Sequence, residues 1–112
     1  MQNTFGIDKS WIDAGLDIDL INEVMDVIAE KRKDREILPS HSDVLNAIKL
    51  TSLDNAKVLI IGQDPYPSAE HAHGLAFSSL SNKTPASLKN IFKKLKEDFP
   101  NKFVRKYFTF KF

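Results

Sequence analysis

Apolar residues recur with a helical period in two separate stretches of this chain. The first runs from Asp19 to Glu36, and its apolar residues share one helical face: Leu20, Ile21, Val24, Met25 and Ile28. The second begins at Thr84-Pro85 and ends near Asp98, with a stripe of Leu88, Ile91, Phe92 and Leu95. We expect Asp19 to cap the first helix and Pro85 to take the first helical position of the second.

The sequence between these stretches predicts a break, a short helix and then a strand. Pro39 ends the first helical pattern, and Ser42 or Asp43 is expected to cap a short helix that carries Leu45 and Ile48. Residues 57–61 then predict a buried strand, in which Lys57 is followed by the apolar run 58–61.

Weaker patterns lie on either side of these elements. Residues 1–18 predict a loosely structured lead-in anchored by Trp11. Residues 62–73 have the Gly, Pro and Ser content of a loop, and Leu75–Phe77 predicts a second extended piece.

Composition narrows the class of protein. A chain of 112 residues with 42% hydrophobic residues makes one small packed domain, and the absence of cysteine excludes disulfides, thiolate zinc sites and a cysteine nucleophile. His41, His71 and His73 lack metal-site spacing. We expect no metal and no organic cofactor. Without a secretory signal pattern or an apolar run near 20 residues, we also expect a soluble, cytoplasmic protein without membrane contact.

Charge is divided unevenly along the chain. Residues 1–82 hold 7 Lys and Arg against 13 Asp and Glu, whereas residues 83–112 hold 9 against 2. The basic segment also carries aromatic residues among its cations, from Phe103 to Phe112. This pattern is more typical of a solvated helix followed by a basic tail, and a nucleic-acid contact is the alternative.

The chemistry-bearing feature is the hexapeptide Gly62-Gln63-Asp64-Pro65-Tyr66-Pro67, directly after the predicted strand. Parallel α/β sheets place their chemistry at the carboxyl ends of strands, and two prolines restrict this loop. A carboxylate held there can orient a water molecule or stabilise the oxocarbenium-like transition state of glycosidic bond cleavage. Tyr66 and Phe77 supply flat faces for a planar base. The alternative is that Asp64 caps a turn and Phe77 is a core residue.

The hexapeptide and a second block, Ala72 to Ser78, together resemble the first signature of the family-1 uracil-DNA glycosylases. The flanking residues Pro39, Asn46-Ala47, Thr51 and Lys57, and later Thr84 to Leu88, extend the resemblance to about residues 11–99. It implies the N-terminal part of a three-layer α/β/α fold with a parallel central sheet, incomplete in this chain. Residues 1–99 would be this portion and residues 100–112 a divergent tail.

The resemblance also implies roles for the matching positions. Asp64 would act on the attacking water and the sugar cation, and Gln63 would contact the uracil through its backbone. Tyr66 would exclude thymine by a clash with its methyl group, and Phe77 would stack on the flipped uracil. Thr84, Pro85 and Ser87 would contact the DNA backbone. Pro67 stands where many relatives have histidine, and we interpret it as a variant.

Other parts of the family pattern have no counterpart here. After Phe99 the sequence has no apolar strand ending in Asn, no His and no Leu. The resemblance thus predicts a uracil-DNA glycosylase of base-excision repair that acts on uracil-containing DNA, with reduced or absent activity in this chain. A complementing polypeptide is one possible partner. The alternatives are a non-catalytic DNA- or protein-binding module and an inactive frameshifted remnant.

Overall fold

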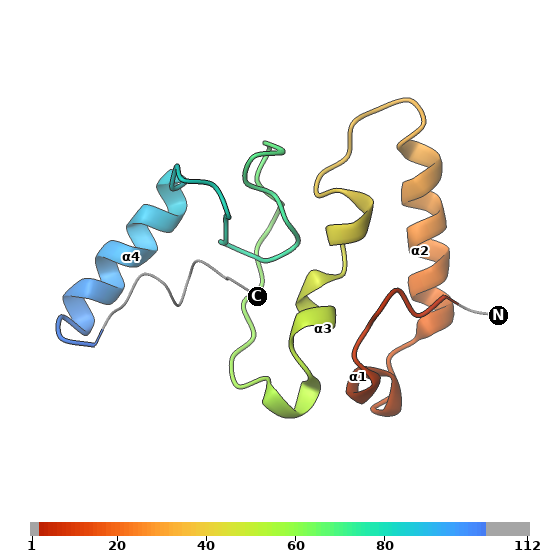
Figure 1. Cartoon of the computed structure of the whole chain (residues 1–112), viewed down its shortest axis with the longest axis horizontal. Helices are drawn as coiled ribbons and strands as arrows, with labels where there is room; N and C mark the ends of the chain where they lie inside the picture. The colour runs from red at the N-terminus through yellow and green to blue at the C-terminus, as the bar shows by residue number, and fades with distance from the viewer. Residues whose placement is uncertain (1–2, 103–112) are drawn as a thin grey trace.

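The elements follow one another across a flat, open molecule. The computed structural model describes residues 3–102, and its helices and 3-10 turns are α1 (Lys9–Asp13), α2 (Ile18–Lys31), η1 (His41–Asp43), α3 (Asn46–Leu50), η2 (Leu53–Asn55) and α4 (Ala86–Asp98). Figure 1 shows α1 and α2 at one end, α4 at the other, and the loop that carries the hexapeptide between α3 and α4. The extents are 50 × 36 × 22 Å. The radius of gyration is 15.8 Å, against about 13 Å for a compact domain of this length.

The helix predicted over residues 19–36 is confirmed as α2, with different ends. Asp17 is its N-cap, because the Asp17 carboxylate accepts a hydrogen bond from the Leu20 N–H at 2.9 Å. The prediction that Asp19 caps this helix is therefore wrong, since Asp19 already lies in the first turn. Ile18 and Met25 of this helix are buried, as are Ile7 before α1 and Leu88 of α4.

The short elements around α2 differ from the sequence prediction in detail. Residues 9–13 are helical rather than loosely structured, because Asp8 caps α1 through the Ser10 N–H at 3.0 Å. A short helix follows Pro39 as expected, but neither Ser42 nor Asp43 caps it. Both residues lie in η1, and the position before α3 makes no side-chain cap.

The predicted strand at residues 57–61 forms no sheet with any other part of residues 3–102. The segment lacks helix and turn, but Val58, Leu59, Ile60 and Ile61 are 56–81% exposed. A strand is stable only when other strands pair with its backbone and other layers cover its faces. The described residues therefore do not confirm the parallel sheet of the expected α/β fold.

The second extended piece, predicted at Leu75–Phe77, is a turn instead. Phe77 has φ +55°, in the left-handed region, and Gly74 has φ +90°. Glycine adopts such a φ freely, whereas a bulky side chain does so rarely, so Phe77 is held there by its surroundings. The turn positions the Phe77 ring for the site described below.

The helix predicted after Thr84-Pro85 is confirmed as α4. Pro85 is its N-cap rather than its first helical residue, and Leu88 of the apolar stripe is 2% exposed. No helix within residues 3–102 is long and apolar enough to span a bilayer. The aromatic and basic residues from Phe103 onward lie outside the described residues, and the boundary at residue 99 stays a prediction.

Candidate active site

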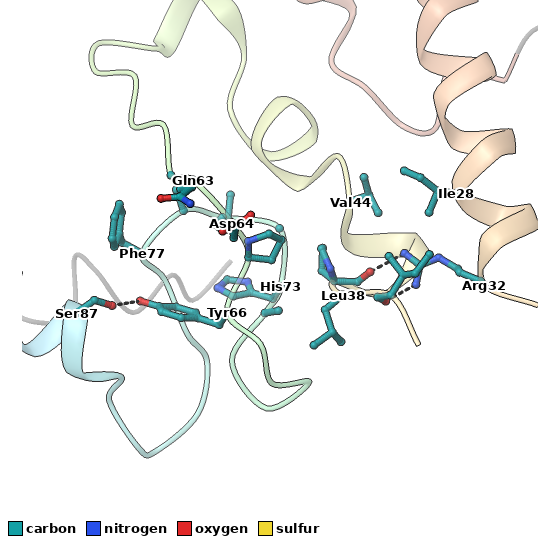
Figure 2. A pocket seen from close by; sticks show the side chains of 18 residues that line it. Ile28, Arg32, Leu38, Val44, Gln63, Asp64, Tyr66, His73, Phe77 and Ser87 are labelled. Carbon is teal, nitrogen blue, oxygen red and sulfur yellow. Dashed lines mark hydrogen bonds between the residues drawn. The ribbon is translucent and has the colours of Figure 1, made fainter. Parts of the chain in front are cut away.

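Two walls enclose a cavity of about 680 Å³ next to the hexapeptide. One wall comes from the two motif blocks and from the start of α4, and the other from α2 and the chain after it. Figure 2 shows Gln63, Asp64, Tyr66 and Phe77 together on the first wall, facing Ile28, Arg32, Leu38 and Val44 across the gap. Residues far apart in the sequence thus share one concave site.

Asp64 lies on the rim of this cavity with its carboxylate accessible. The side chain is exposed and makes no hydrogen bond or ion pair with any residue in the described range 3–102. Gln63 beside it is likewise exposed. An accessible carboxylate on a loop restricted by Pro65 and Pro67 is free to accept a water molecule or to face a developing positive charge.

Tyr66 is fixed from two sides. Its hydroxyl lies 3.2 Å from the Ser87 hydroxyl in the first turn of α4. Its ring meets the His71 ring edge-on, with 5.8 Å between the ring centroids. These contacts hold a flat aromatic side chain upright in the cavity wall, and Figure 2 shows the bond to Ser87.

Phe77 lies on the same wall, where the second block approaches the first. The ring is 38% exposed and lines the cavity. A methyl group on Gly62 would lie 3.6 Å from Ala76 Cβ and 3.9 Å from the Phe77 ring. The two blocks that sequence reasoning paired are therefore in contact, and the ring is not a core residue.

Buried hydrogen bonds hold the second block in place. His73 Nε2 lies 2.8 Å from the hydroxyl of Ser78, which is completely buried, and His71 Nδ1 lies 2.8 Å from the Ser79 hydroxyl. Burial lowers the pKa of His73, and the nearby Asp43 carboxylate partly opposes this shift. His73 thus supports the loop as a neutral imidazole.

The second block is also joined to the helices. The Asn46 side-chain amide donates to the His73 carbonyl at 2.6 Å and to the Asp43 carboxylate at 3.1 Å. Gly74 packs so tightly that a Cβ there would lie 1.8 Å from the Asp43 carbonyl oxygen. The second block therefore depends on residues 43–46 for its position.

Arg32 is a residue of the site that sequence reasoning missed. Its guanidinium donates to the carbonyls of Ile37 and Pro39, which closes the loop between α2 and α3 against the cavity. Its Nε atom is buried without a partner among the described residues. The sequence did not indicate this role, because Arg32 binds backbone carbonyls, and every residue has a backbone carbonyl whatever its side chain.

The residues expected to contact the DNA backbone divide into two groups. Ser87 lines the cavity and binds Tyr66. Thr84 and Pro85 lie at the entry to α4 and outside the cavity lining. The structure thus brings Ser87 to the same cavity as Gln63, Asp64, Tyr66 and Phe77.

Within residues 3–102, no group of three or more His, Asp or Glu side chains is close enough to hold a metal ion. The cavity lining includes the Asp64 carboxylate, the rings of Tyr66 and Phe77 and the Ser87 hydroxyl, together with Arg32 and His73. Such a set suits recognition of a flat base and attack by water at a neighbouring sugar carbon.

Comparison with known proteins bears on the same region. The sequence model of the uracil DNA glycosylase superfamily matches residues 48–110. Uracil-DNA glycosylase from Deinococcus deserti is 39% identical over 99 residues, which are 85% of this chain and 40% of the relative. The enzyme of the same name from Mycoplasmopsis pulmonis is 45% identical over 80 residues, 71% of this chain and 36% of the relative.

A third relative, uracil-DNA glycosylase from Aeromonas hydrophila, is 49% identical over 75 residues, 66% of this chain and 34% of the relative. The chain thus spans about a third to two fifths of the length of the curated relatives that it matches. The family match covers the hexapeptide, the second block and α4. By this match, which covers more than half of its residues, the chain belongs to the uracil DNA glycosylase superfamily.

Proposed function

We propose that this chain carries part of the active site of a uracil-DNA glycosylase, a hydrolase that cleaves the N-glycosidic bond of uracil in DNA. The observation that carries the proposal is the convergence of Gln63, Asp64, Tyr66 and Phe77 on one cavity in a chain of this superfamily. The biological role would be base-excision repair of uracil-containing DNA in the cytoplasm.

Asp64 is the catalytic residue of the proposal. Its carboxylate accepts a hydrogen bond from the attacking water and faces the positive charge that develops on the sugar as the bond to uracil breaks. Its exposed side chain, without a protein partner in the described range, supports this role. Water supplies the new hydroxyl at the sugar carbon, and uracil leaves with the bonding electron pair. The second proton of the water passes to the Asp64 carboxylate and from there through solvent to the uracil anion.

The aromatic residues select the base. Phe77 stacks on the flipped uracil, and Tyr66 blocks the space that the methyl group of thymine needs. The hydrogen-bonding distance between Tyr66 and Ser87 supports a rigid wall, since a mobile tyrosine could not exclude one methyl group. Gln63 binds the uracil through its backbone.

Backbone contacts to DNA fall to Thr84, Pro85 and Ser87 at the start of α4. Lys89, Lys93, Lys94 and Lys96 follow on the exposed surface of this helix and add non-specific attraction to phosphate. A complete three-layer α/β/α fold with a parallel sheet would support the cavity from behind.

The test uses the purified chain and a single-stranded oligonucleotide with one uracil. We expect slow formation of alkali-labile sites at the uracil, none at thymine in the same sequence, and none with Asp64→Asn. Asp54→Asn is the matched control, because Asp54 is also an exposed acid but lies in η2, outside the cavity lining. Absence of cleavage, or cleavage unchanged in Asp64→Asn, rules out catalysis by this chain.

A second candidate function is DNA binding without catalysis. The observation that favours it is the run of exposed lysines on α4. It predicts retention of DNA that falls steeply with salt concentration, shows no preference for uracil and persists in Asp64→Asn. No retention at low salt excludes this function.

A further inference from the structure

Tyr66 lines the cavity, and its ring needs more than its hydroxyl bond to stay in one orientation. The hydroxyl lies 3.2 Å from the Ser87 hydroxyl, but this pair is exposed, so water competes with it and the bond contributes little. A single bond at the tip also leaves the ring free to turn about its long axis. The contact with Ser87 alone therefore does not fix the surface that Tyr66 presents to the cavity.

A second contact acts on the ring itself. The His71 ring meets the Tyr66 ring edge-on, with the ring centroids 5.8 Å apart and an angle of 68° between the ring planes. Edge-on packing is a favoured arrangement of two aromatic rings, because the positive edge of one ring faces the negative face of the other. Turning the Tyr66 ring would break this geometry, so His71 favours one orientation of it.

His71 can act in this way because its own ring is held. Its side chain is only 18% exposed, and its Nδ1 atom lies 2.8 Å from the hydroxyl of the buried Ser79. Its Nε2 atom faces the Glu70 carboxylate at 3.9 Å. Ser81 closes the set, since its hydroxyl donates to Glu70 at 2.7 Å and its N–H to Ser79 at 3.1 Å. The imidazole is thus fixed by Ser79 and flanked by a carboxylate that is itself held.

His71 does not itself reach the space for a ligand. Among the described residues it is not part of the cavity lining, and it lies between the two motif blocks that carry the resemblance. Any effect of His71 on a bound molecule therefore passes through Tyr66. A base that stacks on Phe77 meets the Tyr66 ring with one edge, and the orientation of that ring decides how large a group the edge can carry.

We propose that His71 is a specificity-determining residue, which holds the Tyr66 ring and thereby excludes a methyl group on the bound pyrimidine. That the ligand is a pyrimidine rests on the proposed function, whereas the contact between the two rings does not require catalysis. His71 is a positioning residue, since it acts only through Tyr66. Its loss should leave uracil excision nearly unchanged and admit thymine, which carries a methyl group where uracil carries hydrogen.

Two substitutions separate the ring contact from the hydrogen bond. His71→Asn keeps a polar group for the Ser79 hydroxyl and removes the ring, whereas His71→Phe keeps a ring against Tyr66 and cannot bond to Ser79. Both are compared on single-stranded oligonucleotides with one uracil or one thymine, with the chain in excess. The ratio of uracil to thymine excision should fall about 10-fold in His71→Asn, since a single methyl group is worth about 10- to 200-fold in a fitted pocket. In His71→Phe the ratio should stay close to that of the wild type.

A role for His71 in stability alone predicts the opposite order. His71→Phe leaves the buried Ser79 hydroxyl with one partner fewer and would then be the more disruptive change. His41→Asn is the matched control, because His41 also meets an aromatic ring edge-on, that of Phe5 at 6.4 Å and 69°, and lies outside the cavity lining. This variant should keep the wild-type ratio.

A signal from the Tyr66 ring tests the ring contact without catalysis. The chain has two tyrosines, so fluorotyrosine can be incorporated and its fluorine NMR signals followed, with Tyr66→Phe identifying the signal of Tyr66. His71→Asn should move this signal toward the position of free fluorotyrosine, because the neighbouring ring is gone. His41→Asn should leave it in place.

Three results would overturn the proposal. One is a Tyr66 signal that does not change in His71→Asn, and another is an excision ratio that does not change in this variant. The third is a larger fall of the ratio in His71→Phe than in His71→Asn. A wild-type chain that excises no uracil would contradict the proposed function, and the Tyr66 signal would still decide whether His71 holds the ring.

Discussion

The helical region of this protein, residues 7–50, and its motif region, residues 57–78, satisfy their polar groups in different ways. Helices α1 and α2 have local caps from Asp8 and Asp17, and Ile7, Ile18 and Met25 of this region are buried. The motif region has no regular element within the described chain, and its apolar strand is exposed. A helix closes its backbone hydrogen bonds within itself, whereas a strand depends on distant segments.

The motif region is nevertheless ordered where it meets the helical region. Asn46 binds the carbonyl of His73, and Gly74 lies against the carbonyl of Asp43. Side-chain bonds to the buried Ser78 and Ser79 then shape the second block. The helical region therefore holds the second block in position. We call the contacts of Asn46 with His73 and of Asp43 with Gly74 the junction, and variants at the junction measure how strong this dependence is.

The largest effect is expected for Gly74→Ala. The new Cβ would lie 1.8 Å from a backbone oxygen, at a φ of +90° that alanine disfavours, so the second block must move away from α3. We expect a loss of about 4 kcal/mol in the free energy of unfolding, measured with urea. Hydrogen exchange should rise in residues 71–78 more than in α2.

Gly15→Ala is the control for this variant. Gly15 has φ +104°, but nothing lies within 4 Å of the position that a Cβ would take. Only the backbone strain remains, and the expected loss is about 1 kcal/mol. Equal losses in the two variants would show that contact with Asp43 does not hold the motif region.

The same contrast explains how far the sequence could predict the structure. The 3.6-residue period located α2 and α4, because the residues that form the apolar face of a helix are close together in the sequence. The observed N-caps, Asp17 and Pro85, differ from the predicted helix starts. The sequence around residues 57–61 predicted an extended segment. It could not predict which strands pair with this segment, because strand partners come from distant parts of a sequence.

For the site, the sequence identified the wall that carries chemistry and missed the wall that supports it. Gln63, Asp64, Tyr66 and Phe77 stand out because they lie in the two blocks that resemble the family's first signature. Arg32 and Asn46 act through backbone carbonyls of Pro39 and His73, and a carbonyl has no signature in the sequence.

A second junction variant, Asn46→Asp, removes the hydrogen-bond donor between the two regions while the side chain keeps nearly the same shape. The change replaces a donor with an acceptor opposite the His73 carbonyl and the Asp43 carboxylate, and both contacts become repulsive. We expect a loss of about 2 kcal/mol, because a partly buried carbonyl also loses its partner. Thermal unfolding at pH 7 measures it, with Asn90→Asp on the exposed surface of α4 as the control. A loss no larger than that of the control would contradict the role of Asn46.

A smaller effect is expected inside the helical region from Trp11→Phe. The indole N–H donates to the Thr51 carbonyl at 2.8 Å, which ties α1 to the chain after α3. Phenylalanine keeps most of the ring and removes the donor. The expected loss is about 1 kcal/mol by urea unfolding, since water can reach the exposed Thr51. Hydrogen exchange in residues 71–78 should stay unchanged, because neither Trp11 nor Thr51 contributes to the bonds between Asn46 and the second block.

The smallest effect is a pH dependence that belongs to the motif region alone. Burial lowers the pKa of His73, so the folded state binds fewer protons there than the unfolded chain. Stability from this residue is complete above the ordinary histidine pKa of about 6.5 and falls as the pH drops below it toward the lower folded value. Melting temperatures between pH 7.5 and 5 should show this decline, and His73→Gln should flatten it. The exposed His41 provides the control, because His41→Asn should leave the decline in place. If the decline persists in His73→Gln, the pH response belongs to other groups. That result would contradict the role of a neutral His73 imidazole in supporting the second block.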